Sequence, residues 1–267
     1  MLKSVVIKPT KSHTSTVIFL HGLGDSGHGW SQIGQMASSL LPNVKFIFPH
    51  APVLPITLNN GYQMPAWYDI VSLHNINAKQ DEKGMTESCS KIDELIQFEI
   101  NIGIPSDKIV VGGFSQGAAM SLLYGLTCNH KLGGIVALSG YLPLSAKIEE
   151  LKTAFNNETR FFMGHGTLDD VVKFQYGKSS ADKLKNLGYS VDFRSYNDLG
   201  KESIKHADSF ENTNKKQVIR QLIKKSTTLS IFYQKYNKKF ICAVRPSEFE
   251  NLSIFCGRRK LHLTSSV

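Results

Sequence analysis

The sequence has few cysteines, and their spacing gives them no evident structural use. Cys89, Cys128, Cys242 and Cys256 form no C-x-x-C pair, so the sequence predicts neither a zinc site nor a disulfide framework and favours a reducing compartment. No apolar run is long enough to span a bilayer, and the N-terminus lacks the charged, apolar and small-residue order of a secretory signal. These absences favour a cytoplasmic globular protein.

Nucleic-acid motifs are also lacking, although the chain is basic. It has 267 residues, 41% of them hydrophobic, and a formal net charge of +9. A chain of this length can bury a substantial core as a single α/β domain. Because the positive charge is spread along the sequence, we interpret it as a weak preference for anionic surfaces and not as a nucleic-acid interface.

One segment does carry a specific signal. The apolar run that starts at Ile109 leads into Gly113-Phe-Ser-Gln-Gly117 and then into a helix-forming stretch. This strand, sharp turn and helix with a central serine is the pattern of a nucleophile elbow, in which small residues two places before and after the serine let the backbone bend. Ser115 is therefore the candidate nucleophile.

A serine hydroxyl needs a base and an acid that orients the base. The strand predicted over 159–164 leads to Asp169 and Asp170, and functional groups gather where parallel strands end, so Asp169 is the candidate acid and Asp170 the alternative. The strand predicted over 190–196 is followed by a loop with His206, which is the candidate base because the chain order is then serine, acid, histidine. His165 precedes the acid and is expected to support the turn.

Backbone N–H groups are the expected donors to the oxyanion. One is that of Gln116, at the start of the helix after the serine, and the second is that of Leu23, in the glycine-rich turn after the strand predicted over 16–21. The same turn raises the alternative of a phosphate-binding loop. It lacks the Lys-Ser/Thr pair of a P-loop and the acidic residue of a dinucleotide site, so nucleotide binding is disfavoured.

The order of elements predicts an α/β fold with a mostly parallel central sheet and helices on both faces. Further helices are expected over 30–41, 82–102 and 213–224, and a further strand is expected over 44–48.

Several motifs then occur in order over roughly residues 1 to 225: those beginning at His21, Phe48, Met64, Gly112, Gly134 and His165. Together they resemble the acyl-protein thioesterases of the phospholipase/carboxylesterase family, which have the α/β-hydrolase fold. The resemblance implies a Ser115–His206–Asp169 triad, an oxyanion hole from Leu23 and Gln116, and no metal or cofactor. It also implies S-acylated proteins as substrates, cleaved at palmitoyl thioesters, with lysophospholipids and small esters as alternatives.

The sequence departs from this family in two main places. About five extra residues separate Tyr196 from His206. A longer loop is tolerated at small entropic cost, so His206 is still expected to reach the site. Residues 226–267 have no counterpart that we can identify and are expected to form a poorly ordered basic extension. Its mixture of basic and aromatic residues leaves transient contact with an anionic membrane surface as the alternative.

The loop over 51–73 is long and rich in apolar residues. We expect Trp67 and Leu73, together with Leu23 and Tyr141, to line a channel for the acyl chain, because long loops without regular structure are often functional. Two rivals to a thioesterase stay open: an esterase acting on lysophospholipids or small esters, and a non-catalytic acyl-binding scaffold. The oligomeric state does not follow from the sequence.

Overall fold

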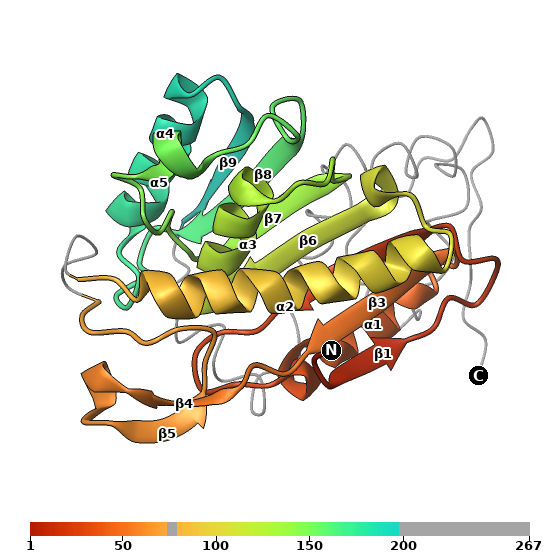
Figure 1. Ribbon diagram of the computed structural model, residues 1–267, viewed down its shortest axis with the longest axis horizontal. Coiled ribbons are helices and arrows are strands. Elements are labelled where there is room, and N and C mark those ends of the chain that lie inside the picture. Colours follow the sequence, from red (N-terminus) through yellow and green to blue (C-terminus); the bar gives the residue numbers. More distant parts are fainter. Residues whose placement is uncertain (74–78, 198–267) are drawn as a thin grey trace, which may run out of the picture.

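The computed structural model describes residues 1–73 and 79–197, which form one open α/β sheet with helices packed against it (Figure 1). The predicted base His206, the helix expected over 213–224 and the extension 226–267 lie outside the described residues. The strands are β1 (Ser4–Ile7), β2 (Ser15–Leu20), β3 (Val44–Pro49), β4 (Val53–Ile56), β5 (Tyr62–Pro65), β6 (Ile109–Phe114), β7 (Gly134–Leu138), β8 (Arg160–Gly166) and β9 (Ser190–Tyr196). The helices are α1 (Gly27–Ser38), α2 (Glu82–Asn101), α3 (Gln116–Thr127), α4 (Ile148–Leu151) and α5 (Phe174–Asn186), with short 3-10 turns at Thr57–Asn59 and Ser106–Lys108.

The main sheet has seven strands in the order β1-β3-β2-β6-β7-β8-β9. Only the β1–β3 pair is antiparallel; the other five neighbouring pairs are parallel. The predicted mostly parallel α/β sheet is therefore confirmed. The central strands β6 and β7 are buried along their whole length, as expected for parallel strands covered on both faces.

Two apolar cores lie on opposite faces of this sheet. The larger core joins one face to α2, α3 and α5, and the smaller one joins the other face to α1. In Figure 1, α2 and α3 pass in front of the sheet and α1 lies behind it. Helix α3 is buried from Gln116 to Leu126, which fixes the helix that follows the candidate nucleophile tightly in the middle of the molecule.

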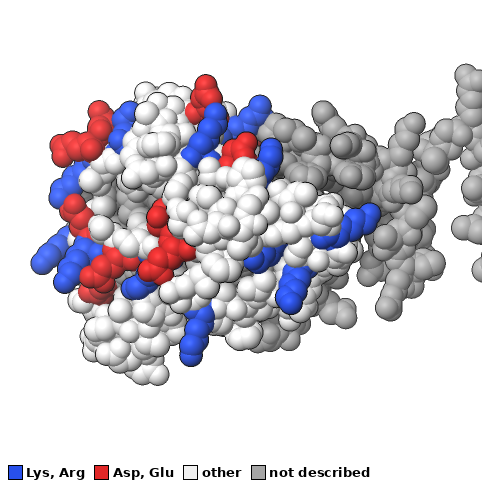
Figure 2. All heavy atoms as spheres, turned by 45° about the vertical axis from the view of Figure 1, so that its right-hand side comes forward, with Lys and Arg blue, Asp and Glu red and all other residues white. Residues whose placement is uncertain are grey.

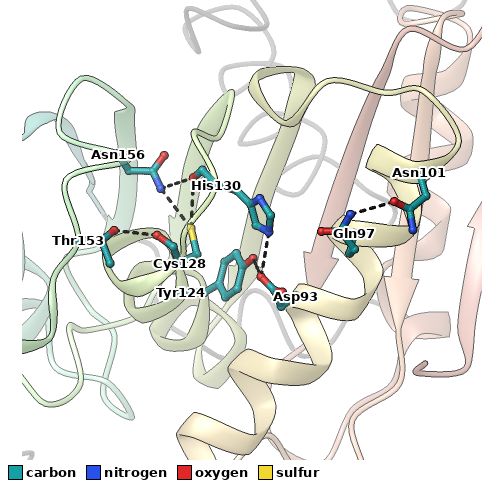
Figure 3. Close-up of polar contacts among 8 residues, drawn as sticks. All are labelled: Asp93, Gln97, Asn101, Tyr124, Cys128, His130, Thr153 and Asn156. Carbon is teal, nitrogen blue, oxygen red and sulfur yellow. Dashed lines mark hydrogen bonds and ion pairs between the residues drawn. The ribbon is translucent and has the colours of Figure 1, made fainter.

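A polar cluster holds the far end of α3, away from Ser115 (Figure 3). The Tyr124 hydroxyl donates to Asp93 Oδ1 of α2 at 2.6 Å, and His130 Nε2 lies 3.3 Å from the same oxygen. Asn156 donates to the His130 carbonyl at 2.8 Å and to Cys128 Sγ at 3.2 Å. Burial raises the pKa of the Cys128 thiol, so this cysteine acts as a packed core residue and not as a nucleophile.

The segment over 51–73 is not the irregular loop that the sequence predicts. Strands β4 and β5 form a separate antiparallel hairpin that projects from the body of the molecule (Figure 1). Asp69 anchors its tip, because its carboxylate accepts from the Thr57 backbone N–H at 2.7 Å and from the Thr57 hydroxyl at 2.6 Å. None of the helices in the described ranges is both long and apolar enough to span a membrane.

Candidate active site

Ser115 occupies the sharp turn between β6 and α3. Its φ of 54° and ψ of −114° are unusual for a residue with a side chain, and such strain persists only where the surroundings enforce it. The Ser115 N–H donates to the Leu138 carbonyl at 2.8 Å, and its carbonyl accepts from Ala119 at 3.1 Å. These bonds to β7 and α3 hold the strained turn, and the side chain stays partly exposed.

Glycines around the turn are required by close packing. A Cβ at Gly113 would strike the backbone of Gly117, and a Cβ at Gly117 would strike the carbonyls at the end of β2. The loop after β2 also reaches the nucleophile, since a Cβ at Gly22 would lie 3.3 Å from the Ser115 Cβ. The structure therefore brings the glycine-rich turn that carries Leu23 directly against Ser115.

The Gln116 side chain ties the turn to the segment that follows the hairpin. Its Oε1 accepts from the Trp67 backbone N–H at 2.9 Å, and its Nε2 donates to the Tyr68 carbonyl at 2.7 Å. The Ser88 hydroxyl on α2 donates to the Trp67 carbonyl. Because the first N–H groups of a helix have no carbonyl acceptor within that helix, the Gln116 N–H is available at the turn for an acyl oxygen.

Asp169 and Asp170 differ sharply in their surroundings. Asp169 follows the end of β8, is 6% exposed, and accepts through Oδ1 from the N–H groups of Val171 at 3.1 Å and Val172 at 2.9 Å. Asp170 is exposed. Hydrogen bonds from backbone N–H groups stabilise a carboxylate and hold it in place. Asp169 is therefore better suited than Asp170 to be the carboxylate that orients the base.

His165 lies next to Asp169. Its Nε2 is 2.8 Å from the Val172 carbonyl and 3.5 Å from Asp169 Oδ2, and the ring is buried against Gly177 of α5. Its bonds are to the turn that carries Asp169, which is the supporting position expected from the sequence. The described structure places Asp169 two strands from Ser115, at the same end of the parallel sheet.

The residues expected to line an acyl channel differ in exposure. Leu23 and Leu73 are partly buried and pack on the larger core. Trp67 is fully buried, and Tyr141 is 6% exposed with its hydroxyl 3.2 Å from that of Tyr68. Burial raises the pKa of both tyrosines, which keeps them neutral. Their part in acyl binding stays a prediction.

Sequence reasoning missed one buried residue beside the elbow. His21 follows β2, has no exposed surface, and uses both ring nitrogens in hydrogen bonds to backbone groups of the loops around Ser115. The position of His21 between an apolar strand and a glycine-rich turn was visible in the sequence, but its partners were not.

A strained serine between a buried parallel strand and a buried helix, with a glycine-rich loop against it and a buried aspartate at a nearby strand end, defines a serine hydrolase of the α/β-hydrolase fold. The family model described as phospholipase/carboxylesterase matches residues 1–212. The chain belongs to this family.

Similar proteins agree with this assignment. The chain is 49% identical over 193 residues to acyl-protein thioesterase 1 of Cryptococcus neoformans, covering 71% of this chain and 81% of the relative. It is 47% identical over 212 residues to acyl-protein thioesterase 1 of Yarrowia lipolytica, covering 78% and 91%. The crystal structure of Zea mays acyl-protein thioesterase 2 superposes with a TM-score of 0.69 at 32% identity, covering 86% of this chain and all of that one.

Proposed function

We propose that this protein hydrolyses long-chain acyl thioesters on protein cysteines, palmitoyl groups above all, through an acyl-enzyme on Ser115. The observation that carries the proposal is the elbow itself, with Ser115 at a φ of 54° and the Gly22 turn packed against its Cβ. The relatives named above, acyl-protein thioesterases that this chain matches over most of their length, support the choice of substrate.

In this mechanism the Ser115 hydroxyl attacks the acyl carbonyl while His206, oriented by Asp169, takes its proton. The N–H groups of Leu23 and Gln116 bind the resulting oxyanion, a contribution worth roughly 3 kcal/mol for each donor. The protonated histidine then assists departure of the thiol. A thiolate, with an ordinary pKa of about 8.5, leaves readily, so a thioester demands less of the acid than an amide does. Water then attacks the acyl-enzyme while His206 takes its proton, and the histidine returns this proton to Ser115 as the fatty acid leaves.

The acyl chain supplies binding energy beside the elbow. Each buried methylene contributes about 0.8 kcal/mol, so ten methylenes contribute roughly 8 kcal/mol before ordering costs. We assign this burial to the partly exposed side chains of Leu23 and Leu73, which pack on the core that contains the buried Trp67 and Tyr141.

The deciding experiment compares kcat/KM of the full-length protein on an S-palmitoyl peptide and on a matched lysophospholipid. Ser115→Ala is the blank, and labelling by a fluorophosphonate reports on the nucleophile. Preference for the thioester with loss of both activity and labelling in Ser115→Ala supports the proposal. Preference for the lipid would make the protein a lysophospholipase, and labelling retained in Ser115→Ala would refute the assignment of the nucleophile.

We also propose that the enzyme acts in the cytoplasm and meets its substrates by transient contact with membrane surfaces. The chain carries a net charge of +9, and basic side chains are spread over the face in Figure 2 with acidic ones interspersed. Basic residues near an anionic bilayer contribute about 1 kcal/mol each. Sedimentation with vesicles that contain phosphatidylserine tests this; equal recovery with neutral vesicles would contradict it.

A further inference from the structure

His21 joins the end of β2 to two loops that meet at the elbow. Ala51 N–H donates to its Nε2 at 3.0 Å, and its Nδ1 lies 2.7 Å from the Gly22 carbonyl. Because Nε2 accepts, the neutral ring carries its proton on Nδ1 and donates it to Gly22. Burial lowers the pKa of His21 from its ordinary value, which favours this neutral form.

The Gly22 carbonyl belongs to the same peptide unit as the Leu23 N–H. The two groups of a trans peptide point in opposite directions, so a bond that fixes the carbonyl also fixes the N–H. The Asp25 N–H reaches the same carbonyl at 3.2 Å. With glycines at 22 and 24, the backbone has little steric preference of its own, and rotation of this peptide would turn the Leu23 N–H away from an oxyanion.

We propose that His21 is a positioning residue, whose Nδ1–H holds the Gly22–Leu23 peptide in the orientation that lets the Leu23 N–H stabilise the oxyanion formed at Ser115. This inference rests on the proposed hydrolase function and names a residue that sets its rate. His21 touches neither the substrate nor Ser115 in this role; it acts through the peptide that it orients.

A second bond fixes the preceding peptide. The His21 carbonyl accepts from Trp67 Nε1 at 2.8 Å, and the Trp67 backbone N–H is in turn held by the Gln116 side chain at 2.9 Å. One network therefore connects the loop of Leu23 to the residue that supplies the other oxyanion donor. Both donors are backbone groups, and side chains outside the reacting centre set their geometry.

Two amide substitutions separate the two ring bonds. The amide of Asn is placed near the position of a histidine Nδ1, so His21→Asn retains a donor for the Gly22 carbonyl and gives up the Ala51 acceptor. The longer Gln reaches the position of Nε2, so His21→Gln retains the Ala51 acceptor and gives up the Gly22 donor. We expect kcat on an activated acyl ester to fall by about 10²-fold in His21→Gln, as for loss of one oxyanion donor, with KM little changed. His21→Asn should retain kcat within about five-fold of the natural protein on the same reasoning.

Controls keep the inference separate from the proposed function and from simple destabilisation. If the natural protein does not hydrolyse the ester, the proposed function fails, and if Ser115→Ala keeps full activity, the assignment of Ser115 as nucleophile fails, whatever His21 does. If Ser115→Ala has no hydrolytic activity and the two His21 variants have equal kcat, the positioning role of His21 is refuted. His50→Gln is the matched control, since the partly buried His50 ring accepts from the Gly27 N–H at 3.2 Å in the adjoining loop, and it should leave kcat unchanged.

The two tryptophans give a second comparison for the case in which the His21 variants fail to fold. Both are buried, at 0% exposed for Trp67 and 5% for Trp30, but only Trp67 bonds to His21. Trp67→Phe removes the Nε1 donor to the His21 carbonyl and keeps an aromatic ring. Trp30→Phe makes the same change in the smaller core. At a comparable loss in Tm, we expect the lower kcat in Trp67→Phe; equal kcat values would overturn the inference.

Discussion

Gly117→Ala tests whether contacts at the elbow outweigh helix propensity. Gly117 is the second residue of α3, and replacing glycine by alanine inside a helix stabilises it by at most about 1 kcal/mol. Here the added methyl would strike the Leu20 carbonyl and lie 2.6 Å from the His21 carbonyl. Relief of the His21 contact to an ordinary separation of about 3.5 Å requires a shift of roughly 0.9 Å, and the shorter Leu20 contact requires a larger one, in buried backbone.

Overpacking of this kind costs up to about 3 kcal/mol, so the expected net loss is about 2 kcal/mol. For a domain of this size that corresponds to a fall in Tm of roughly 4 to 8 °C. The shifted carbonyl is that of His21, which precedes the loop carrying Leu23, and displacements near 1 Å at a reacting centre can cost about 10²-fold. We therefore expect kcat to fall by about 10- to 100-fold as well.

Gly125→Ala is the matched control within the same helix. Its added methyl would lie 2.7 Å from the Cδ1 and Cγ1 atoms of Ile135, which are side-chain atoms and not backbone carbonyls. A cost of about 1 kcal/mol then nearly cancels the gain in propensity. Urea unfolding and kcat on an activated ester measure both variants. Gly117→Ala that is as stable and as active as Gly125→Ala would refute the reasoning.

Three further outcomes follow from the site. Asp169→Asn should lower kcat by about 10³- to 10⁴-fold, through loss of the charge that orients the base, and Asp170→Asn should stay near the natural rate; the reverse order would exchange their roles. Leu73→Asp should remove the preference for long acyl chains in kcat/KM across esters of increasing length, and an unchanged preference would exclude this residue from the channel. Burial lowers the pKa of His21, so its contribution to the free energy of unfolding is complete above the unfolded value of about 6.5 and is lost as the pH falls towards the folded pKa. Urea unfolding at several pH values should show a shallower decline in His21→Asn; equal slopes would count against a neutral buried ring.

Local patterns explain why so much of the sheet could be predicted. The elbow strand and helix, and the strands over 159–164 and 190–196, carry continuous apolar runs or turn signals within a few residues of each other, and the structure has each of them. The first helix begins at Gly27, three residues before the predicted Trp30. Two glycines and a histidine in its first turn have low helix propensity, and packing against β1 and β3 determines the start instead.

The hairpin was missed because its strands contain prolines. Pro55 lies inside β4 and Pro65 ends β5, and proline normally argues against a strand. A two-stranded ribbon tolerates them, because each strand has one edge without a partner. A signal was present: Asn60 and Gly61, both at positive φ between the strands, form the dipeptide most typical of tight hairpin turns.

The residues that hold the oxyanion loop illustrate a different limit. A nucleophile elbow is encoded within about ten residues, so its strain and its glycines are readable from sequence. The His21 ring bonds to the adjacent residue 22 and to residue 51, and the Gln116 side chain bonds to residues 67 and 68. No local spacing relates these side chains to backbone groups 30 or more residues away, and adjacency alone does not show that the ring of His21 turns towards residue 22. Backbone N–H donors have no side chain of their own to mark them. Where catalysis depends on such donors, the residues that control the rate are the side chains orienting those peptides, and only the folded geometry identifies them.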